Sequence, residues 1–380
     1  MNVVLTVYIF ICIMLLIFNI VFLSYKNAQK SALFNNTNII EKKFCEKYSE
    51  YNSVYGMDDD FKKFILSSIS KIKSFVALIS YIESNEINSN LKKEIRNILI
   101  EYMDYYSKKD NYEKAYYMYV LSIFDYSNVK ISRIIKNKTL EFLDTKSLYV
   151  FANTMNFIYK IPDTELIIRA IEYINDADGF YSRKLFVDGM MSYCGDIDEL
   201  KEKLEKNFFD YNVFTQISLL DYFRMKKIDI KDMGMRIIKN NIIDVEVKYS
   251  AMRYFISKPS KESREYFISV LKDENSFWIE KMISIQGLNR YKDDDIHYLI
   301  REYTSDRNWY VRTNAIKYLS DYGIDSDEIS YILYKKDKYA NEEILYQYKD
   351  DDDMTSYIEE IMELIRKEDN KNYTPKRGDI

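Results

Sequence analysis

Three pairs of aspartates with the spacing Asp-x-Asp are the residues in this sequence best suited to chemistry. They are Asp176/Asp178, Asp196/Asp198 and Asp325/Asp327. Two carboxylates with this spacing can hold a divalent cation on a nucleotide sugar when they stand at the end of a strand. No strand pattern precedes these pairs, and each pair opens or precedes a segment with helical periodicity, where aspartate caps free amides. Helix capping is therefore the favoured interpretation, and a metal-dependent enzyme is the alternative.

The single histidine and the three cysteines do not form a catalytic motif. No Ser/His/Asp or Cys/His arrangement can be drawn around His297, which we expect at the surface or lining a groove. Cys12, Cys45 and Cys194 are widely spaced and contain no CxxC pair, so they indicate neither a zinc site nor a disulfide framework. We interpret them as reduced structural thiols in a reducing compartment. We predict no catalytic residue and no bound metal.

Composition argues against nucleotide and nucleic-acid ligands. The 380 residues include 8 glycines and 3 prolines, and no phosphate-binding motif of the G-x-x-x-x-G-K-[ST] or G-x-G-x-x-G type occurs. The net charge is −5, and no block of Lys and Arg is free of interspersed acids. We predict no cofactor, no nucleotide and no nucleic-acid partner. So few turn-forming residues favour an all-α fold of helices joined by short polar turns.

The N-terminal segment has the length and composition of a membrane span. Val3–Leu23 is a run of 21 uncharged residues, and about 20 apolar residues cross the hydrocarbon core as a helix. No basic residue precedes this run and no small-residue cleavage site follows it, so we predict that residues 1–25 are a retained transmembrane anchor. Lys26 and Lys30 follow the run. Positive flanks stay in the cytoplasm, which predicts a single-pass protein of the cell membrane with its N-terminus outside and its helical domain cytoplasmic.

Apolar residues beyond the anchor recur at helical spacing and at a fixed longer interval. Val247, Ile279 and Val311 each open a stripe and lie 32 residues apart. Four residues after each opening position come Ala251, Ile283 and Ala315, and eight residues after it come Phe255, Gly287 and Leu319. The register extends upstream through Tyr149, Tyr181 and Val213. Between the stripes stand the triplets Phe267/Val270/Leu271, Ile296/Leu299/Ile300 and Ile329/Ile332/Leu333. Two helices in about 32 residues form a hairpin that buries its apolar face by stacking on neighbours, which predicts an α-solenoid.

One segment carries a recognisable repeat signature. Residues 306–323 read DRNWYVRTNAIKYLSDYG, with signature positions Asp306, Val311, Arg312, Ala315, Leu319 and Gly323. This segment resembles a HEAT repeat. In that family the Asp and Arg typically hydrogen-bond between adjacent repeats, so the resemblance implies the same for Asp306 and Arg312. The pattern weakens upstream, where Glu280 and Lys248 replace the arginine.

The expected organisation has five parts. They are an anchor (1–25), a divergent helical region (26–140), HEAT-like repeats of about 32 residues (141–350), a capping helix (351–368) and a polar tail (369–380). By analogy of fold, we expect a scaffold or adaptor that binds a protein partner at the membrane surface, such as an accessory subunit of a cell-envelope assembly. Trp278 and Trp309 are its candidate partner contacts, with packing between repeats as their alternative role. A metal-dependent enzyme or glycosyltransferase-associated factor using the Asp pairs, and an exported binding module, are the alternative functions.

Overall fold

The computed structural model describes residues 2–51, 54–176, 181–291 and 293–372, without the side chains of residues 2–6, 9, 27–36 and 369–372. Within these ranges the chain is all-α and contains no β-strand, which confirms the predicted fold class. The chain divides into two compact units. Unit 1 comprises Met1–Tyr181 with Ser192–Asp196, and unit 2 comprises Ser182–Met191 with Ile197–Ile380. The division falls inside the region 141–350 for which the sequence predicts repeats.

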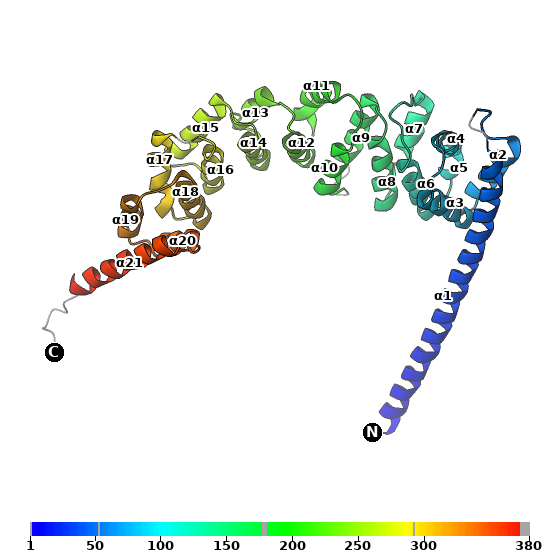
Figure 1. Ribbon diagram of the computed structural model, residues 1–380, viewed down its shortest axis with the longest axis horizontal. Helices are drawn as coiled ribbons and strands as arrows, with labels where there is room; N and C mark the ends of the chain where they lie inside the picture. The colour runs from blue at the N-terminus through cyan, green and yellow to red at the C-terminus, as the bar shows by residue number, and fades with distance from the viewer. Residues whose placement is uncertain (1, 52–53, 177–180, 292, 373–380) are drawn as a thin grey trace. The chain divides into compact units, whose positions relative to one another are not determined.

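Unit 1 contains the first nine helices. They are α1 (Asn2–Glu50), α2 (Asp59–Ile69), α3 (Ile72–Ser84), α4 (Ser89–Glu101), α5 (Met103–Tyr106), α6 (Asn111–Ser122), α7 (Arg133–Glu141), α8 (Leu148–Tyr159) and α9 (Thr164–Asp176). Helix α6 packs on α8, and α7 packs on α9 (Figure 1). Alternate helices are therefore neighbours, as expected when successive hairpins stack.

Unit 2 continues the same alternation. Its helices are α10 (Arg183–Met191), α11 (Ile197–Asn207), α12 (Val213–Lys226), α13 (Lys231–Ile238), α14 (Val245–Ser257), α15 (Lys261–Lys272), α16 (Trp278–Leu288), α17 (Asp294–Arg301), α18 (Trp309–Tyr322), α19 (Ser326–Tyr334), α20 (Lys338–Gln347) and α21 (Asp352–Asn372), with 3-10 turns η1 (Phe208–Asp210) and η2 (Glu302–Ser305). Helices α12, α14, α16, α18 and α20 pack side by side in sequence. In Figure 1, α11, α13 and α15 lie on the other side of this layer. The arrangement is consistent with a helical-repeat solenoid.

The predicted stripes form the core of unit 2. Val247, Ala251 and Phe255 are fully buried on α14, and Val311, Ala315 and Leu319 are fully buried on α18. On the opposite layer, the triplets of α15, α17 and α19 pack inward, with Leu299 the least buried member. On α16, between α14 and α18, Ile283 and Gly287 are buried but Ile279, which opens the stripe, is only half-buried. The 32-residue interval therefore marks equivalent core positions for the later members of each stripe, and the prediction is wrong for Ile279.

The upstream extension of that register is wrong in its choice of residues. Tyr149 is 77% exposed and Val213 is 40% exposed, and only Tyr181 is buried. The buried residue of α12 that lies 32 residues before Val247 is Thr215. Val213 opens its helix ahead of the first buried turn, so its side chain points out although its residue type is apolar. The predicted register therefore paired an exposed position of α12 with a buried position of α14.

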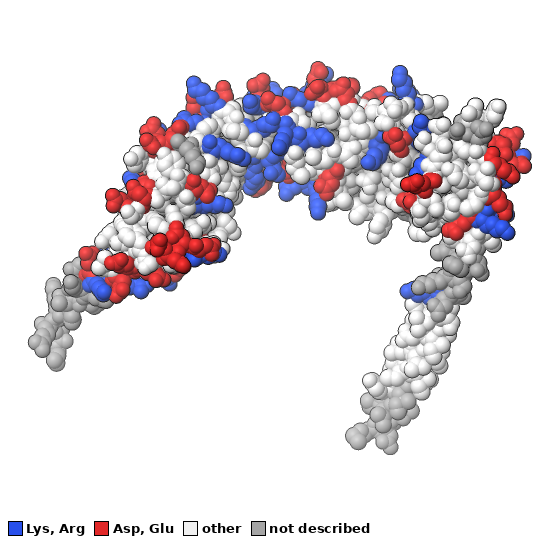
Figure 2. All heavy atoms as spheres, in the orientation of Figure 1, with Lys and Arg blue, Asp and Glu red and all other residues white. Residues whose placement is uncertain are grey.

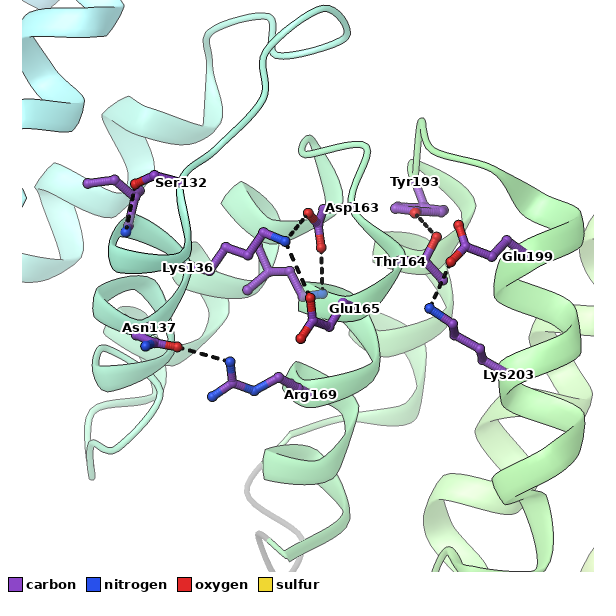
Figure 3. Close-up of polar contacts among 12 residues, drawn as sticks. Ser132, Lys136, Asn137, Asp163, Thr164, Glu165, Arg169, Tyr193, Glu199 and Lys203 are labelled. Carbon is purple, nitrogen blue, oxygen red and sulfur yellow. Dashed lines mark hydrogen bonds and ion pairs between the residues drawn. The ribbon is translucent and has the colours of Figure 1, made fainter.

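Polar contacts join α7 and α9 in unit 1. Asp163 accepts a hydrogen bond from the backbone N–H of Leu166, 2.8 Å away, and pairs with Lys136 of α7 at 2.5 Å (Figure 3). Lys136 also lies 3.5 Å from Glu165, and Arg169 donates to Asn137 at 3.0 Å. The hydrogen bond to Asp163 raises the pKa of Lys136. These contacts fix α9 against α7 while their apolar faces are buried.

Helix α1 has two parts with opposite environments. Its C-terminal part packs into unit 1, where Ile40 and Phe44 are buried and the Phe44 ring lies 5.5 Å from that of Phe61. Every described large apolar side chain from Val7 to Tyr25 is instead 49–65% exposed. Figure 2 shows this earlier section of α1 without charged side chains on the visible face. The apolar section makes no core with the rest of its unit.

Among the described residues, no single helix is both long and apolar enough to cross a membrane. Phe10–Lys26 is a shorter apolar section, and the successive helices α2 and α3 reach the required composition only as a pair bent by 117°. The predicted span Val3–Leu23 includes residues 3–6 and 9, which lie outside the residues with described side chains.

Candidate protein-docking surface

The carboxylates that could bind metal lie apart in the described structure. Among the described residues, no three His, Cys, Asp or Glu side chains gather into a group that could hold a metal ion. Asp325 caps α19 by accepting from the backbone N–H of Glu328 at 2.9 Å, which is the geometry expected of a capping aspartate. Asp178 lies outside the described residues.

His297 is buried, not at the surface or in a groove as the sequence predicted. The residue is 5% exposed on α17, and its Nε2 hydrogen-bonds Glu328 in the first turn of α19. Its ring packs 4.5 Å from that of Tyr322 on α18. The two partners come from the next hairpin, 25 and 31 residues further along the chain. His297 therefore connects neighbouring hairpins and has no access to a solvent-borne substrate.

The signature residues of the HEAT-like segment hold one hairpin together. Val311, Ala315 and Leu319 are buried on α18, and Gly323 ends that helix with φ +93°, where its N–H donates to the Leu319 carbonyl at 3.0 Å. A positive φ favours glycine because other residues meet a steric penalty there. The Asp306 carboxylate accepts from the backbone N–H of Asn308 at 2.7 Å.

The hydrogen bond implied between repeats for Asp306 and Arg312 is absent from these described side chains. Arg312 Nη1 donates to the backbone carbonyls of Asp306 and Arg307, at 2.7 and 3.2 Å, within the same repeat. Its guanidinium lies 5.1 Å from the ring centroid of Tyr339 on α20. Arg312 thus binds its own turn by hydrogen bonds and contacts the next hairpin through a cation–π interaction.

The two tryptophans differ in environment. The Trp278 ring is half-buried and stacks on Tyr310 of the next hairpin, with centroids 5.4 Å apart and planes 17° apart. Trp309 is 52% exposed, and its ring meets Tyr310 edge-on at 4.8 Å. Trp278 is chiefly a packing residue between repeats, whereas Trp309 presents half of its surface to solvent.

Trp309 belongs to a row of exposed apolar side chains at the N-terminal ends of successive parallel helices. This N-terminal row consists of Val213 on α12, Val245 on α14, Phe277 before α16 and Trp309 on α18, which are 40%, 48%, 55% and 52% exposed. Its members lie 32 residues apart in the sequence. Since the helices pack side by side, the row follows one edge of unit 2. Exposed apolar side chains that repeat along one edge make that edge a candidate surface for association.

One ion pair joins two of the helices that carry the row. Lys248 of α14 donates to Glu280 of α16 at 2.5 Å, and Glu280 also accepts from the backbone N–H of Phe277 at 3.1 Å. Burial lowers the pKa of Lys248, but the hydrogen bond and charge of Glu280 together with Tyr266 outweigh burial and leave the pKa raised. The charged pair therefore connects α14 and α16.

Of this row, the sequence predicts Trp309 as a candidate contact and Val213 as a stripe position, and it misses Val245 and Phe277. The signal was present, because Val213, Val245, Phe277 and Trp309 share the repeat interval. It was obscured by the core stripe that begins two residues later, whose apolar residues have the same period.

Neither a protein-family model nor a curated protein sequence matches this chain.

Proposed function

We propose that this protein is a membrane-anchored, HEAT-like scaffold whose N-terminal row binds a protein partner at the cytoplasmic membrane surface. The anchor comprises residues 1–25, and the helical units follow it on the cytoplasmic side. Tethering restricts the search for a partner to the membrane plane and raises its effective concentration. An accessory role in a cell-envelope assembly fits a scaffold placed there.

The exposed apolar section of α1 supports the anchor. Apolar side chains on every face of a helix are stable in lipid or against another protein, and unfavourable in water. Each described large apolar residue from Val7 to Tyr25 exposes about half of its surface or more. The first lysines follow directly at Lys26 and Lys30, and such residues stay on the cytoplasmic side.

The N-terminal row is the observation that carries the binding function. Interfaces are enriched in aromatic residues and depleted of charge at their centres. Phe277 and Trp309 have these properties, and Tyr310 beside them is 50% exposed. Stacking of Trp278 on Tyr310 holds the aromatic end of the row in place, so little side-chain entropy is lost when a partner binds.

A pull-down with row variants tests this function. Cells expressing the tagged chain are cross-linked, and their membranes are extracted in detergent. The amount of partner recovered is compared with that from cells expressing F277S/W309S. Hot-spot aromatics typically contribute enough binding energy that the double variant should recover roughly tenfold less partner. Tyr298→Ser is the matched control, since Tyr298 is 58% exposed on α17, outside the row.

Two results would overturn the proposal. One is equal recovery of the same partner by the wild-type chain and the double variant, both still membrane-bound. The other is recovery of no specific partner by the wild-type chain. Circular dichroism of the purified variants checks that the helices remain folded.

A further inference from the structure

Asn19 is the one residue with a side-chain amide in the apolar section of α1 from Val7 to Leu23. Its side chain is exposed, and no hydrogen bond joins it to another of the described side chains. An amide without a partner is unfavourable in hydrocarbon, because its donor and acceptor lose their hydrogen bonds to water. Asn19 is therefore the residue that the proposed anchor leaves unsatisfied.

The position of Asn19 keeps its amide away from the lipid headgroups. Leu23 ends the apolar run four residues later, which is about 6 Å along a helix. A lysine at this depth reaches the interface through its long alkyl chain, but the asparagine amide is attached to its backbone through one methylene group. The headgroups are thus out of reach, and a hydrogen-bonding partner within the bilayer would satisfy the amide.

Asn19 of a second copy is a complementary partner. The amide carries both an acceptor oxygen and a donor nitrogen, so two such amides related by a two-fold axis exchange two hydrogen bonds. Copies of a single-pass protein share one orientation in the membrane, which makes their α1 helices parallel and brings equal positions together at equal depth. In parallel helical pairs, one asparagine at an interface position sets the register and the number of helices.

The position of Asn19 also defines the face of α1 that would form the contact. Parallel helices in a left-handed pair meet at positions that alternate four and three residues apart. Counted back and forward from Asn19, these positions within the apolar section are Tyr8, Cys12, Leu15 and Phe22, and all four are exposed. Cys12 lies one heptad before Asn19, so its thiol would face the thiol of the second copy.

We propose that α1 pairs with α1 of a second copy inside the membrane, through mutual hydrogen bonds of Asn19 and contacts along the face of Cys12 and Leu15. The inference rests on the proposed anchorage, because water would satisfy the amide outside a bilayer. A transmembrane segment of another protein is the alternative occupant, but it would need its own polar group at the depth of Asn19. A second copy always supplies one. The pair would carry two N-terminal rows, which makes the scaffold bivalent.

Oxidative cross-linking of Cys12 tests the pairing. In a C45S/C194S background Cys12 is the only thiol of the full chain. Native membranes at low expression and proteoliposomes of the purified chain are treated with copper phenanthroline, which oxidises two thiols to a disulfide only where they meet closely. A covalent dimer is then measured on a non-reducing gel. N19V should weaken dimerisation roughly three- to thirtyfold, the effect of a hydrogen bond between membrane helices. N19Q keeps an amide and should retain most of the dimer.

Moving the thiol and the amide to the opposite face gives a matched control. Met14 and Val21 are 54% and 61% exposed, and each follows Cys12 or Asn19 by two residues, about 200° around the helix. C12S/M14C should cross-link poorly, and so should Cys12 in N19V/V21N. The combined variant C12S/M14C/N19V/V21N should cross-link again, because its thiol and amide are one heptad apart on a shared face.

Carbonate extraction of the membranes separates failure of the pairing from failure of the anchor. Release of the chain by carbonate would overturn the anchor and the pairing together. A carbonate-resistant chain that cross-links equally in C12S/M14C, or equally with N19V, overturns the pairing alone. So does a chain that stays monomeric in proteoliposomes while Cys12 cross-links to a protein of another mass in native membranes. F277S/W309S should cross-link normally, since the N-terminal row lies on unit 2.

Discussion

Buried tyrosines in this protein carry out two tasks with one side chain. Their rings fill the space between helices, as where Tyr106 and Tyr117 stack with centroids 4.3 Å apart. Their hydroxyls then donate to carbonyls near helix ends, Tyr106 to Ile69 and Tyr117 to Leu99, each at 2.5 Å. Helix C-termini leave carbonyls without intrahelical partners, so each such tyrosine satisfies a group that phenylalanine could not. This accounts for tyrosine in place of phenylalanine at positions 106 and 117.

The same burial predicts unfolding in alkali. Burial is the main cause that raises the pKa of Tyr254 to about 12 and of Tyr51 to about 12, from an ordinary value of 10.0. The folded state therefore holds these protons more tightly than the unfolded state, and their contribution to stability is complete below about pH 10 and lost as pH rises towards 12. Circular dichroism and phenolate absorbance are recorded together from pH 8 to 12. The exposed tyrosines should ionise first, and a later part of the phenolate signal, from the buried tyrosines, should appear together with the loss of helix.

Tyr254→Phe is the control for that transition. It removes one group with a raised pKa and also the hydrogen bonds of Tyr254 to the backbone of Ile228 and Ile230, at 3.2 and 3.0 Å. The variant should be less stable at neutral pH and lose less stability between pH 10 and 12. Ionisation of all the tyrosines before any loss of helix would show that burial does not protect these protons.

Residue environments were predictable where one helix decides them and unpredictable where a neighbour does. The core faces of α14 and α18 follow from helical periodicity alone. The burial of His297 depends on Glu328, and the contact of Arg312 with Tyr339 depends on the placement of α20. Sequence spacing gives no sign of which side chains from the next hairpin meet these groups.

Between elements, the close packing of α15 and α16 depends on one glycine. Gly287 occupies the stripe position held by Phe255 and Leu319 in neighbouring repeats. A Cβ atom there would lie 2.3 Å from the ring of Phe267, which is fully buried on α15. The Phe267 ring on α15 therefore occupies the space that a side chain at Gly287 of α16 would fill. In the sequence, Gly287 was visible only as a missing large residue in the stripe.

Replacing this glycine should destabilise unit 2. In Gly287→Ala the new methyl group collides with a ring that has no room to move, at a cost of about 1–3 kcal/mol. Urea unfolding followed by circular dichroism measures the change. Ser284→Ala on the same helix is the control, because Ser284 is buried and the substitution adds no volume. Equal stability of G287A and the wild-type chain would mean that α15 and α16 separate easily.

The presence of helices was predictable from the sequence, but the residues at which they begin and end were not. The sequence places an anchor at residues 1–25 and a separate helical region after it, whereas α1 continues from Asn2 to Glu50. No glycine or proline occurs between residues 26 and 50 to end it. The change from apolar to polar composition marks a change of environment, and the backbone does not break there.

For the whole molecule, the proposed orientation predicts which thiols a reagent outside the cell can reach. Cys45 and Cys194 are free and exposed, and both follow the anchor. A membrane-impermeant maleimide should leave them unmodified in intact cells and label them after permeabilisation. Burial raises the pKa of the Cys194 thiol, which lowers the fraction of reactive thiolate at Cys194 at neutral pH.

A Cys12→Ser background removes the thiol of the proposed anchor, so that the signal reports only the helical units. Labelling of Cys45 in intact, unpermeabilised cells would reverse the orientation and favour the exported binding module. The orientation, the partner and the docking surface are beyond what the sequence could establish. The orientation depends on only two lysines, and the partner is another molecule. The docking surface consists of exposed positions that follow the same interval as the core.

The unbroken backbone of α1 has a mechanical consequence under the proposed anchorage. Lys26, at the end of the apolar section, and Phe44, in the core of unit 1, are joined by a single helix, and at 1.5 Å per residue they stand about 27 Å apart along its axis. The helix acts as a stiff stalk that sets both the height of unit 1 above the bilayer and its angular phase. Each residue inserted into this stalk would turn unit 1 by about 100° and lift it by about 1.5 Å, so stalk length decides which face a membrane-bound neighbour meets.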